Sequence, residues 1–180
     1  MPLRTARTPS LAPAVALAVA LALAAGATLT ACSSGGSLDY RSDYSAHEPL
    51  RVVGYPSTGS LDVVQKAVWR LADRDADALA ALAVEDDDAD ADADATARTW
   101  VRAFGAAAQG EVTADFYDEG STRQVVVLYF AKSGQVKEIE ARIGADDTWG
   151  ITLAEPNPAV ATARPTWAPA KPGGSGSKSE

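Results

Sequence analysis

The chain has 180 residues, of which 47% are hydrophobic, and a formal net charge of −8. This length suits one domain with appendages, and the acidic balance without a basic stripe excludes the phosphate neutralisation on which nucleic-acid binding depends. One cysteine and one histidine exclude an intramolecular disulfide and a Cys/His metal cluster.

The N-terminal segment has the pattern of a secretory signal peptide. Arg4 and Arg7 form a short positive region, and an apolar stretch rich in Ala, Leu and Val follows over residues 11–25. It runs into Leu29-Thr30-Ala31-Cys32, which resembles the lipobox of bacterial lipoprotein precursors. In that family a diacylglyceryl group is attached to the cysteine and a peptidase cuts in front of it. The resemblance covers residues 1–32 and implies a signal peptide over residues 1–31 and lipidation of Cys32.

Two other interpretations of this segment remain open. Ala25-Gly26-Ala27 fits the site of the ordinary signal peptidase, which would release a secreted protein with a free Cys32. Alternatively, the segment stays as a membrane anchor, since its length approaches the ~20 residues that span a bilayer. We expect lipidation, because the flexible Ser33–Ser37 follows the cysteine directly. The membrane would then be a partner through the lipid, and the domain would lie on the outer face of the bacterial cytoplasmic membrane.

Residues 32–59 predict a flexible tether. They are rich in Ser, Gly, Asp and Tyr and contain Pro49 and Pro56, and a chain of this length reaches roughly 30 Å. Only residues 50–53 hint at a short strand. His47 lies in this tether, where a histidine is expected to be solvated, because catalysis would require its delivery to the domain.

Residues 60–155 predict a globular domain that begins with three helices. Ser60 and Asp75 can cap the first two helices, and a third is expected from about Ala95 to Phe104, ended by Gly105. Apolar residues recur at helical spacing in all three: Leu61, Val64, Val68 and Leu71 in the first, Ala78, Leu79, Leu82 and Ala83 in the second, and Ala97, Trp100, Val101 and Phe104 in the third.

The acidic run of residues 85–94 precedes the third helix and has aspartates at alternate positions. An EF-hand calcium loop needs Gly at its sixth position and Glu at its twelfth. Loops starting at Asp86, Asp88 or Asp90 have Ala at the sixth position, and Ala, Thr or Val at the twelfth. We therefore expect a solvated loop and no metal site.

After Gly110 the period changes to two, which predicts strands. Alternating strands are expected over residues 112–117, 138–143 and 149–153. Residues 124–131 are apolar on both faces, as a central strand should be. Turns separate these strands at residues 118–121, Ser133-Gly134 and Asp146-Asp147. Helices followed by an antiparallel meander predict an α+β fold, with the helices packed on one face of a sheet of about four strands.

This order of elements, together with the Phe-Tyr-Asp-Glu-Gly turn before a hydrophobic strand, resembles the nuclear-transport-factor-two-like cone fold. The resemblance covers residues 60–154 and implies a curved sheet with helices on its concave side. Such folds host enzymes, binding modules and structural domains alike.

The aromatic residues of the domain lie mostly on periodic faces, so we expect them in the core rather than around a pocket: Trp69, Trp100, Phe104, Phe116, Tyr129 and Trp149. Asp73 or Asp75 with Tyr129 could imitate the acid-and-tyrosine pair of cone-fold isomerases, but helix capping explains both aspartates equally well. No Gly-rich phosphate loop follows a strand. We therefore predict no catalytic residue and no cofactor.

Residues 156–180 are rich in Pro, Gly and Ser and predict a disordered tail. Trp167 lies alone in it, and we expect a partly exposed side chain rather than a docking residue. The chain as a whole predicts a membrane-anchored lipoprotein whose domain binds a protein or small-ligand partner without catalysis. The alternative is a cone-fold enzyme of the isomerase or dehydratase type.

Overall fold

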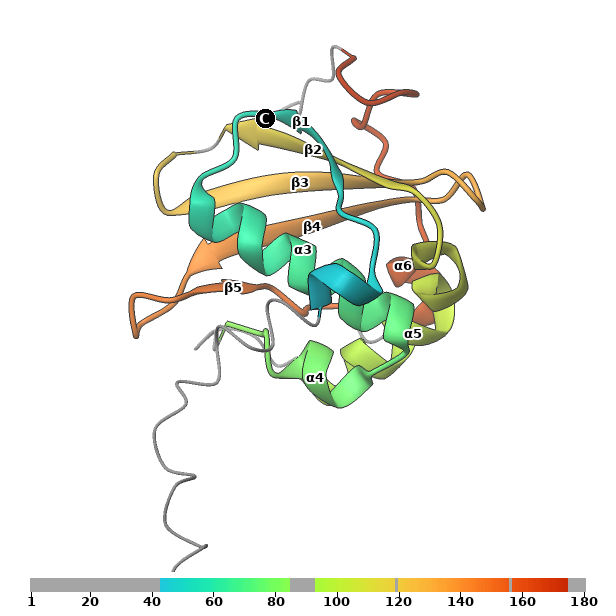
Figure 1. The fold of residues 1–180 in the computed structure, drawn as a ribbon, viewed down its shortest axis with the longest axis horizontal. Helices are drawn as coiled ribbons and strands as arrows, with labels where there is room; N and C mark the ends of the chain where they lie inside the picture. The colour runs from blue at the N-terminus through green and yellow to red at the C-terminus, as the bar shows by residue number, and fades with distance from the viewer. Residues whose placement is uncertain (1–42, 85–92, 119, 156, 175–180) are drawn as a thin grey trace, which may run out of the picture. The chain divides into compact units, whose positions relative to one another are not determined.

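A computed structural model describes residues 43–84, 93–118, 120–155 and 157–174 (Figure 1). The chain divides into Met1–Arg41 and Ser42–Glu180, and every described residue belongs to the second unit. This unit combines helices with an open, mixed five-stranded sheet in the order β1-β2-β3-β4-β5. The predicted α+β class is confirmed.

The strands are β1 (Arg51–Gly54), β2 (Val112–Asp118), β3 (Arg123–Phe130), β4 (Val136–Ile143) and β5 (Trp149–Ile151). Neighbouring strands from β2 to β5 are antiparallel, as predicted. The prediction of about four strands misses β1, which pairs in parallel with β2 at the edge of the sheet. Three of the four residues in β1 are exposed, so the strand has no apolar alternation by which a sequence could reveal its pairing.

The helices are α3 (Thr58–Asp73), α4 (Ala76–Ala80), α5 (Ala93–Ala108) and α6 (Pro158–Ala161). Asp75 caps α4 as predicted, because its side chain accepts from the Ala78 N–H. The cap of α3 is Ser57 rather than Ser60, which is buried in the first turn. Gly105 does not end α5. A Cβ there would lie 2.9 Å from the Leu71 carbonyl oxygen, so glycine permits the close approach of α5 to α3.

Helices α3, α4 and α5 pack on one face of the sheet (Figure 1). The inward residues of β2 are Val112, Ala114 and Phe116, which confirms the predicted alternation. Phe104 of α5 stacks on Phe130 of β3, with ring centroids 5.3 Å apart. The predicted burial of the aromatic side chains is confirmed for Trp69, Trp100, Phe104, Phe116 and Tyr129, and Trp149 is partly buried. The three tryptophans nevertheless also line cavities, so the expectation that they do not border a pocket is wrong.

The opposite face of the sheet is covered by residues 163–174, which follow α6. The Trp167 ring meets the Tyr117 ring edge-on, with centroids 5.0 Å apart, and its Nε1–H donates to Glu138 Oε2 at 2.6 Å. The Tyr129 hydroxyl donates to the Pro169 carbonyl at 3.2 Å. The prediction of a disordered tail is therefore wrong for residues 157–174, which we call the C-terminal tail. Proline needs no N–H partner, so a Pro-rich segment can lie across a sheet face that a tryptophan anchors.

Residues 43–50, which we call the N-terminal strap, pack against α3. The Leu50 N–H donates to Gln65 Oε1 at 3.0 Å, and the Trp69 indole N–H donates to the Glu48 carbonyl at 3.2 Å. The predicted boundary of the domain at residue 60 is therefore too late, because the strap and β1 belong to the domain. Within the described ranges, no helix has the length and apolarity needed to cross a membrane.

Candidate functional site

Two features that the sequence singled out, Cys32 and residues 85–92 of the acidic run, lie outside the described residues. Asp94 is in the first turn of α5, where a carboxylate is favoured by the helix dipole. In the part of the chain that the structure describes, no group of three His, Cys, Asp or Glu side chains could hold a metal ion.

His47 lies in the strap and its side chain packs against α3, so the expectation of a solvated side chain is wrong. Its Nδ1 donates to the Asp43 carbonyl at 2.9 Å, and its Nε2 lies 2.7 Å from Asp73 Oδ1. Its ring stacks on Trp69 at 5.5 Å. Arg70 pairs with both Asp43, at 2.6 Å, and Asp73, at 3.2 Å. These contacts hold the strap against α3.

Raising the pH should weaken this packing. Burial lowers the pKa of His47, but its bonds to Asp73 and to the Asp43 backbone, and the charges of both residues, raise that pKa above 6.5 overall. The resulting stabilisation is fully present below the unfolded pKa of 6.5 and is lost as the pH rises through the folded pKa. Because the Asp73 side chain is 38% exposed, we expect a loss of at most about 1 kcal/mol, the upper end for an exposed ion pair, as the pH rises from below 6.5 through the folded pKa.

Urea denaturation across this pH range measures the effect. His47→Phe keeps a ring against Trp69 and removes both hydrogen bonds, so it should remove this part of the pH dependence. Equal pH dependence in the two proteins would show that His47 does not titrate with folding.

The structure does not bring Asp73 or Asp75 near Tyr129. The two aspartates lie at the ends of α3 and α4, while Tyr129 packs under the C-terminal tail. Asp115 alternates in the sequence with the inward-facing residues of β2, yet its side chain is buried on the opposite face of the sheet. Its Oδ2 accepts from the Tyr117 hydroxyl at 3.1 Å and from the Gly173 N–H at 2.7 Å. Burial, followed by the charge of Asp115, raises the pKa of both tyrosines.

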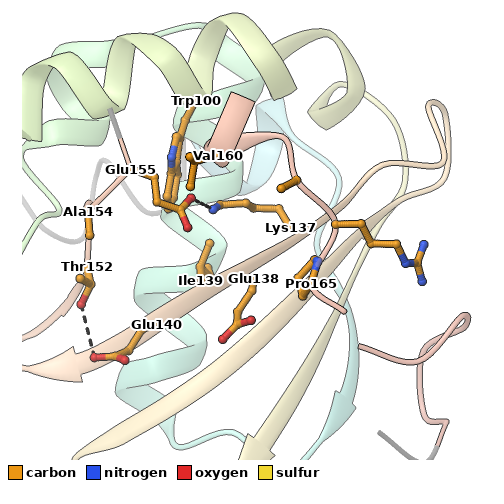
Figure 2. A pocket seen from close by; sticks show the side chains of 12 residues that line it. Trp100, Lys137, Glu138, Ile139, Glu140, Thr152, Ala154, Glu155, Val160 and Pro165 are labelled. Carbon is orange, nitrogen blue, oxygen red and sulfur yellow. Dashed lines mark hydrogen bonds and ion pairs between the residues drawn. The ribbon is translucent and has the colours of Figure 1, made fainter. Parts of the chain in front are cut away.

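A cavity of about 350 Å³ lies at the edge of β4, between the segment that follows β5 and the segment that follows α6 (Figure 2). We call it the edge cavity. It exists because β5 has three residues and pairs only with Ala141–Ile143. Among the described residues, the first half of β4 therefore pairs with β3 alone. The volume is at the lower end of the range for small-molecule sites, roughly 300–1,000 Å³.

Lys137 forms the floor of the edge cavity and is 4% exposed. Its ammonium pairs with the Glu155 carboxylate and lies 4.6 Å from the centre of the Trp100 ring, and Figure 2 shows the three side chains meeting. Burial lowers the pKa of Lys137. The hydrogen bond and the charge of Glu155 oppose this effect, but the pKa stays below its usual value. The sequence carried a signal for this residue, because Lys137 is in phase with the inward-facing Ile139 and Ala141 of β4.

Trp100 also lines the edge cavity and is 2% exposed. Its indole Nε1–H has no hydrogen-bond partner among the described residues. A buried donor without a partner costs about 1–3 kcal/mol, and such an atom in a native structure calls for an explanation such as a water or a ligand. The nitrogen itself has essentially no accessible surface, so this donor is buried beside the cavity and is not offered to a molecule inside it.

The other carboxylates that line the edge cavity have partners. Glu138 accepts from the Trp167 indole, while Glu140 pairs with Arg123 at 2.6 Å and accepts from the Thr152 hydroxyl at 3.5 Å (Figure 2). The lining thus combines charged side chains that have partners in the protein with apolar side chains such as Ile139, Val160 and Pro165.

Comparisons with protein-family models, curated proteins and solved structures find no match for this chain.

Proposed function

We propose that this chain is a bacterial lipoprotein, anchored through lipid on Cys32 to the outer face of the cytoplasmic membrane. Its domain binds a partner or a small ligand without transforming it. The order of positive region, apolar stretch and lipobox in residues 1–32 supports the anchor.

The observation that carries the non-catalytic role is the filled space between the helices and the sheet. Phe104, Phe130 and Leu128 are fully buried there, together with Val64 and Val126. A cone-fold enzyme needs an open pocket on this side, with an acid and a tyrosine that converge in it. The pair that does converge, Asp115 and Tyr117, lies on the opposite face with the C-terminal tail packed against it. The isomerase or dehydratase alternative therefore has less support.

The edge cavity favours binding over catalysis for a second reason. A general acid or base must exchange a proton with a substrate, whereas Glu138, Glu140 and Glu155 already have partners in the protein. The cavity thus offers hydrogen bonds more readily than proton transfer.

Replacing Cys32 by alanine should abolish incorporation of radiolabelled palmitate and release the protein from the membrane fraction. A diacylglyceryl group brings two acyl chains, each methylene contributes about 0.8 kcal/mol, and two chains hold a protein stably. Labelling is measured after expression in a bacterial host, and Ser33→Ala, one residue away, is the matched control that should label normally. Label retained by Cys32→Ala, or absent from the parent chain, would contradict the anchor.

A further inference from the structure

We propose that the N-terminal strap is a latch, which a proton on His47 holds closed against α3. The closed strap covers Trp69 and forms one side of a cavity of about 330 Å³, which we call the strap cavity. Loss of the proton releases the strap, while the helices and the sheet stay folded. The inference goes beyond the proposed binding role and stands without the proposed anchor.

Both ring nitrogens of His47 face atoms that only accept hydrogen bonds. Nδ1 lies 2.9 Å from the Asp43 carbonyl oxygen, and Nε2 lies 2.7 Å from Asp73 Oδ1. A neutral imidazole has one N–H group, whereas the imidazolium has two. Only the protonated ring therefore satisfies both contacts, because the neutral ring would place a nitrogen lone pair against an oxygen at one of them.

The charges around His47 lead to the same protonation state. Arg70 pairs with Asp43 at 2.6 Å and with Asp73 at 3.2 Å, so two carboxylates share one guanidinium. The imidazolium supplies the second positive charge, and the four charges then balance. A neutral ring would leave one negative charge in excess, at a place where the His47 side chain is only 12% exposed.

The other groups that line the strap cavity cannot replace this proton. Glu48 of the strap adds a further negative charge. The lining residues contributed by α5, β2 and the turn between them carry no charge: Ala108, Gln109, Gly110 and Val112. His47 is the only histidine of the chain, and histidine is the side chain whose ordinary pKa lies between about pH 5 and about pH 8. The closed state thus depends on one titrating group.

Trp69 is the side chain that a released strap would uncover. Its ring stacks on His47 at 5.5 Å and meets Tyr44 edge-on at 4.8 Å, and its indole N–H donates to the Glu48 carbonyl at 3.2 Å. All three partners belong to the strap. Other residues of α3, such as Val64, pack in the core with the sheet, so release would expose the strap side of α3 and leave the core covered.

Release would also lengthen the free chain in front of β1. Residues 43–50 would no longer be held on α3, and eight extended residues reach up to about 26–29 Å. In a chain anchored at Cys32, a rise in pH on the outer side of the membrane would therefore let the domain move away from the lipid.

Hydrogen exchange of the full chain in detergent micelles, followed by NMR from about pH 5.5 to about pH 9, tests the latch. The backbone amides of His47 and Leu50 are hydrogen-bonded in the closed strap. After correction for the intrinsic rate, we expect their protection to fall between about twofold and about fivefold as the pH rises through the folded pKa. The amides of β3 should keep their protection. The Trp69 indole resonance, assigned as the one lost in Trp69→Phe, should shift with the same midpoint.

Two substitutions and a matched control identify the titrating group. His47→Phe keeps a ring against Trp69 and should remove the pH dependence. Asp73→Asn keeps an acceptor for Nε2–H but removes the charge that favours the imidazolium, so the midpoint should move to lower pH. Asp62→Asn makes the same change elsewhere on α3, where Asp62 pairs with Lys66 at 2.8 Å, and should leave the midpoint in place.

A change in strap protection below about twofold, or an equal loss of protection in β3, overturns the inference. A midpoint at or below pH 6.5 also overturns it, as does a pH dependence that survives in His47→Phe. Failure of the proposed anchor appears separately, as absence of palmitate on Cys32, and leaves the exchange measurement unaffected.

Discussion

Phe104→Ala should lower the free energy of unfolding by about 3–5 kcal/mol, the usual cost of removing a buried aromatic ring. Phe104 stacks on Phe130 at 5.3 Å and is fully buried between α5 and the sheet. The hole left behind would be lined by helix on one side and by strand on the other, and neither can collapse into it without moving the other. Domains are stable by only about 5–15 kcal/mol, so this change should remove a large part of the total.

Chemical denaturation followed by circular dichroism measures this loss. Val160→Ala is the matched control, because Val160 is 52% exposed and its truncation should cost less than about 0.5 kcal/mol. A loss below about 1 kcal/mol for Phe104→Ala would mean that the packing between α5 and β3 contributes little to stability.

Ending the chain after Glu155 should destabilise the domain by at least about 3 kcal/mol and expose an apolar surface. The deletion removes Trp167 from Tyr117, removes α6 with its buried Ala161, and takes the Gly173 N–H away from the buried Asp115 carboxylate. The newly exposed side chains would include Val127 and Tyr129. We expect a lower denaturation midpoint and stronger binding of a hydrophobic dye.

A chain that ends after Gly174 is the matched control for this deletion. It keeps every tail contact described above, so its stability should equal that of the full chain. If the two shortened proteins unfold at the same denaturant concentration, the C-terminal tail does not stabilise the sheet.

The sequence predicted most of the regular elements, because each has a pattern of apolar residues of its own. Helical spacing located α3, α4 and α5, alternation located β2, β4 and β5, and a run that is apolar on both faces located β3. The segments that sequence reasoning missed lack such a pattern. The strap is held by single contacts to α3, such as His47 with Asp73 and Leu50 with Gln65, and these join residues far apart in sequence. Composition alone made both ends of the domain look unstructured.

The edge cavity, likewise, could be predicted from the sequence only in part. The inward phase of Lys137 could be read from β4, and the helical periodicity placed Trp100 in the core. The contact of Lys137 and Trp100 with Glu155 depends on the path of the segment that follows β5. No local sequence pattern predicts that path. The buried Asp115 was missed for the same reason, because its surroundings come from the C-terminal tail.

The strap is also the first part of the domain that a pulling force on the proposed anchor would reach. A chain anchored at Cys32 would pass a pull on its lipid along the backbone to Asp43, the first described residue, which pairs with Arg70 of α3 at 2.6 Å. The ion pairs of Arg70 and His47 would bear that tension before β1 is reached. We therefore expect these ion pairs to separate under force before β1 does, while the sheet and its core stay folded.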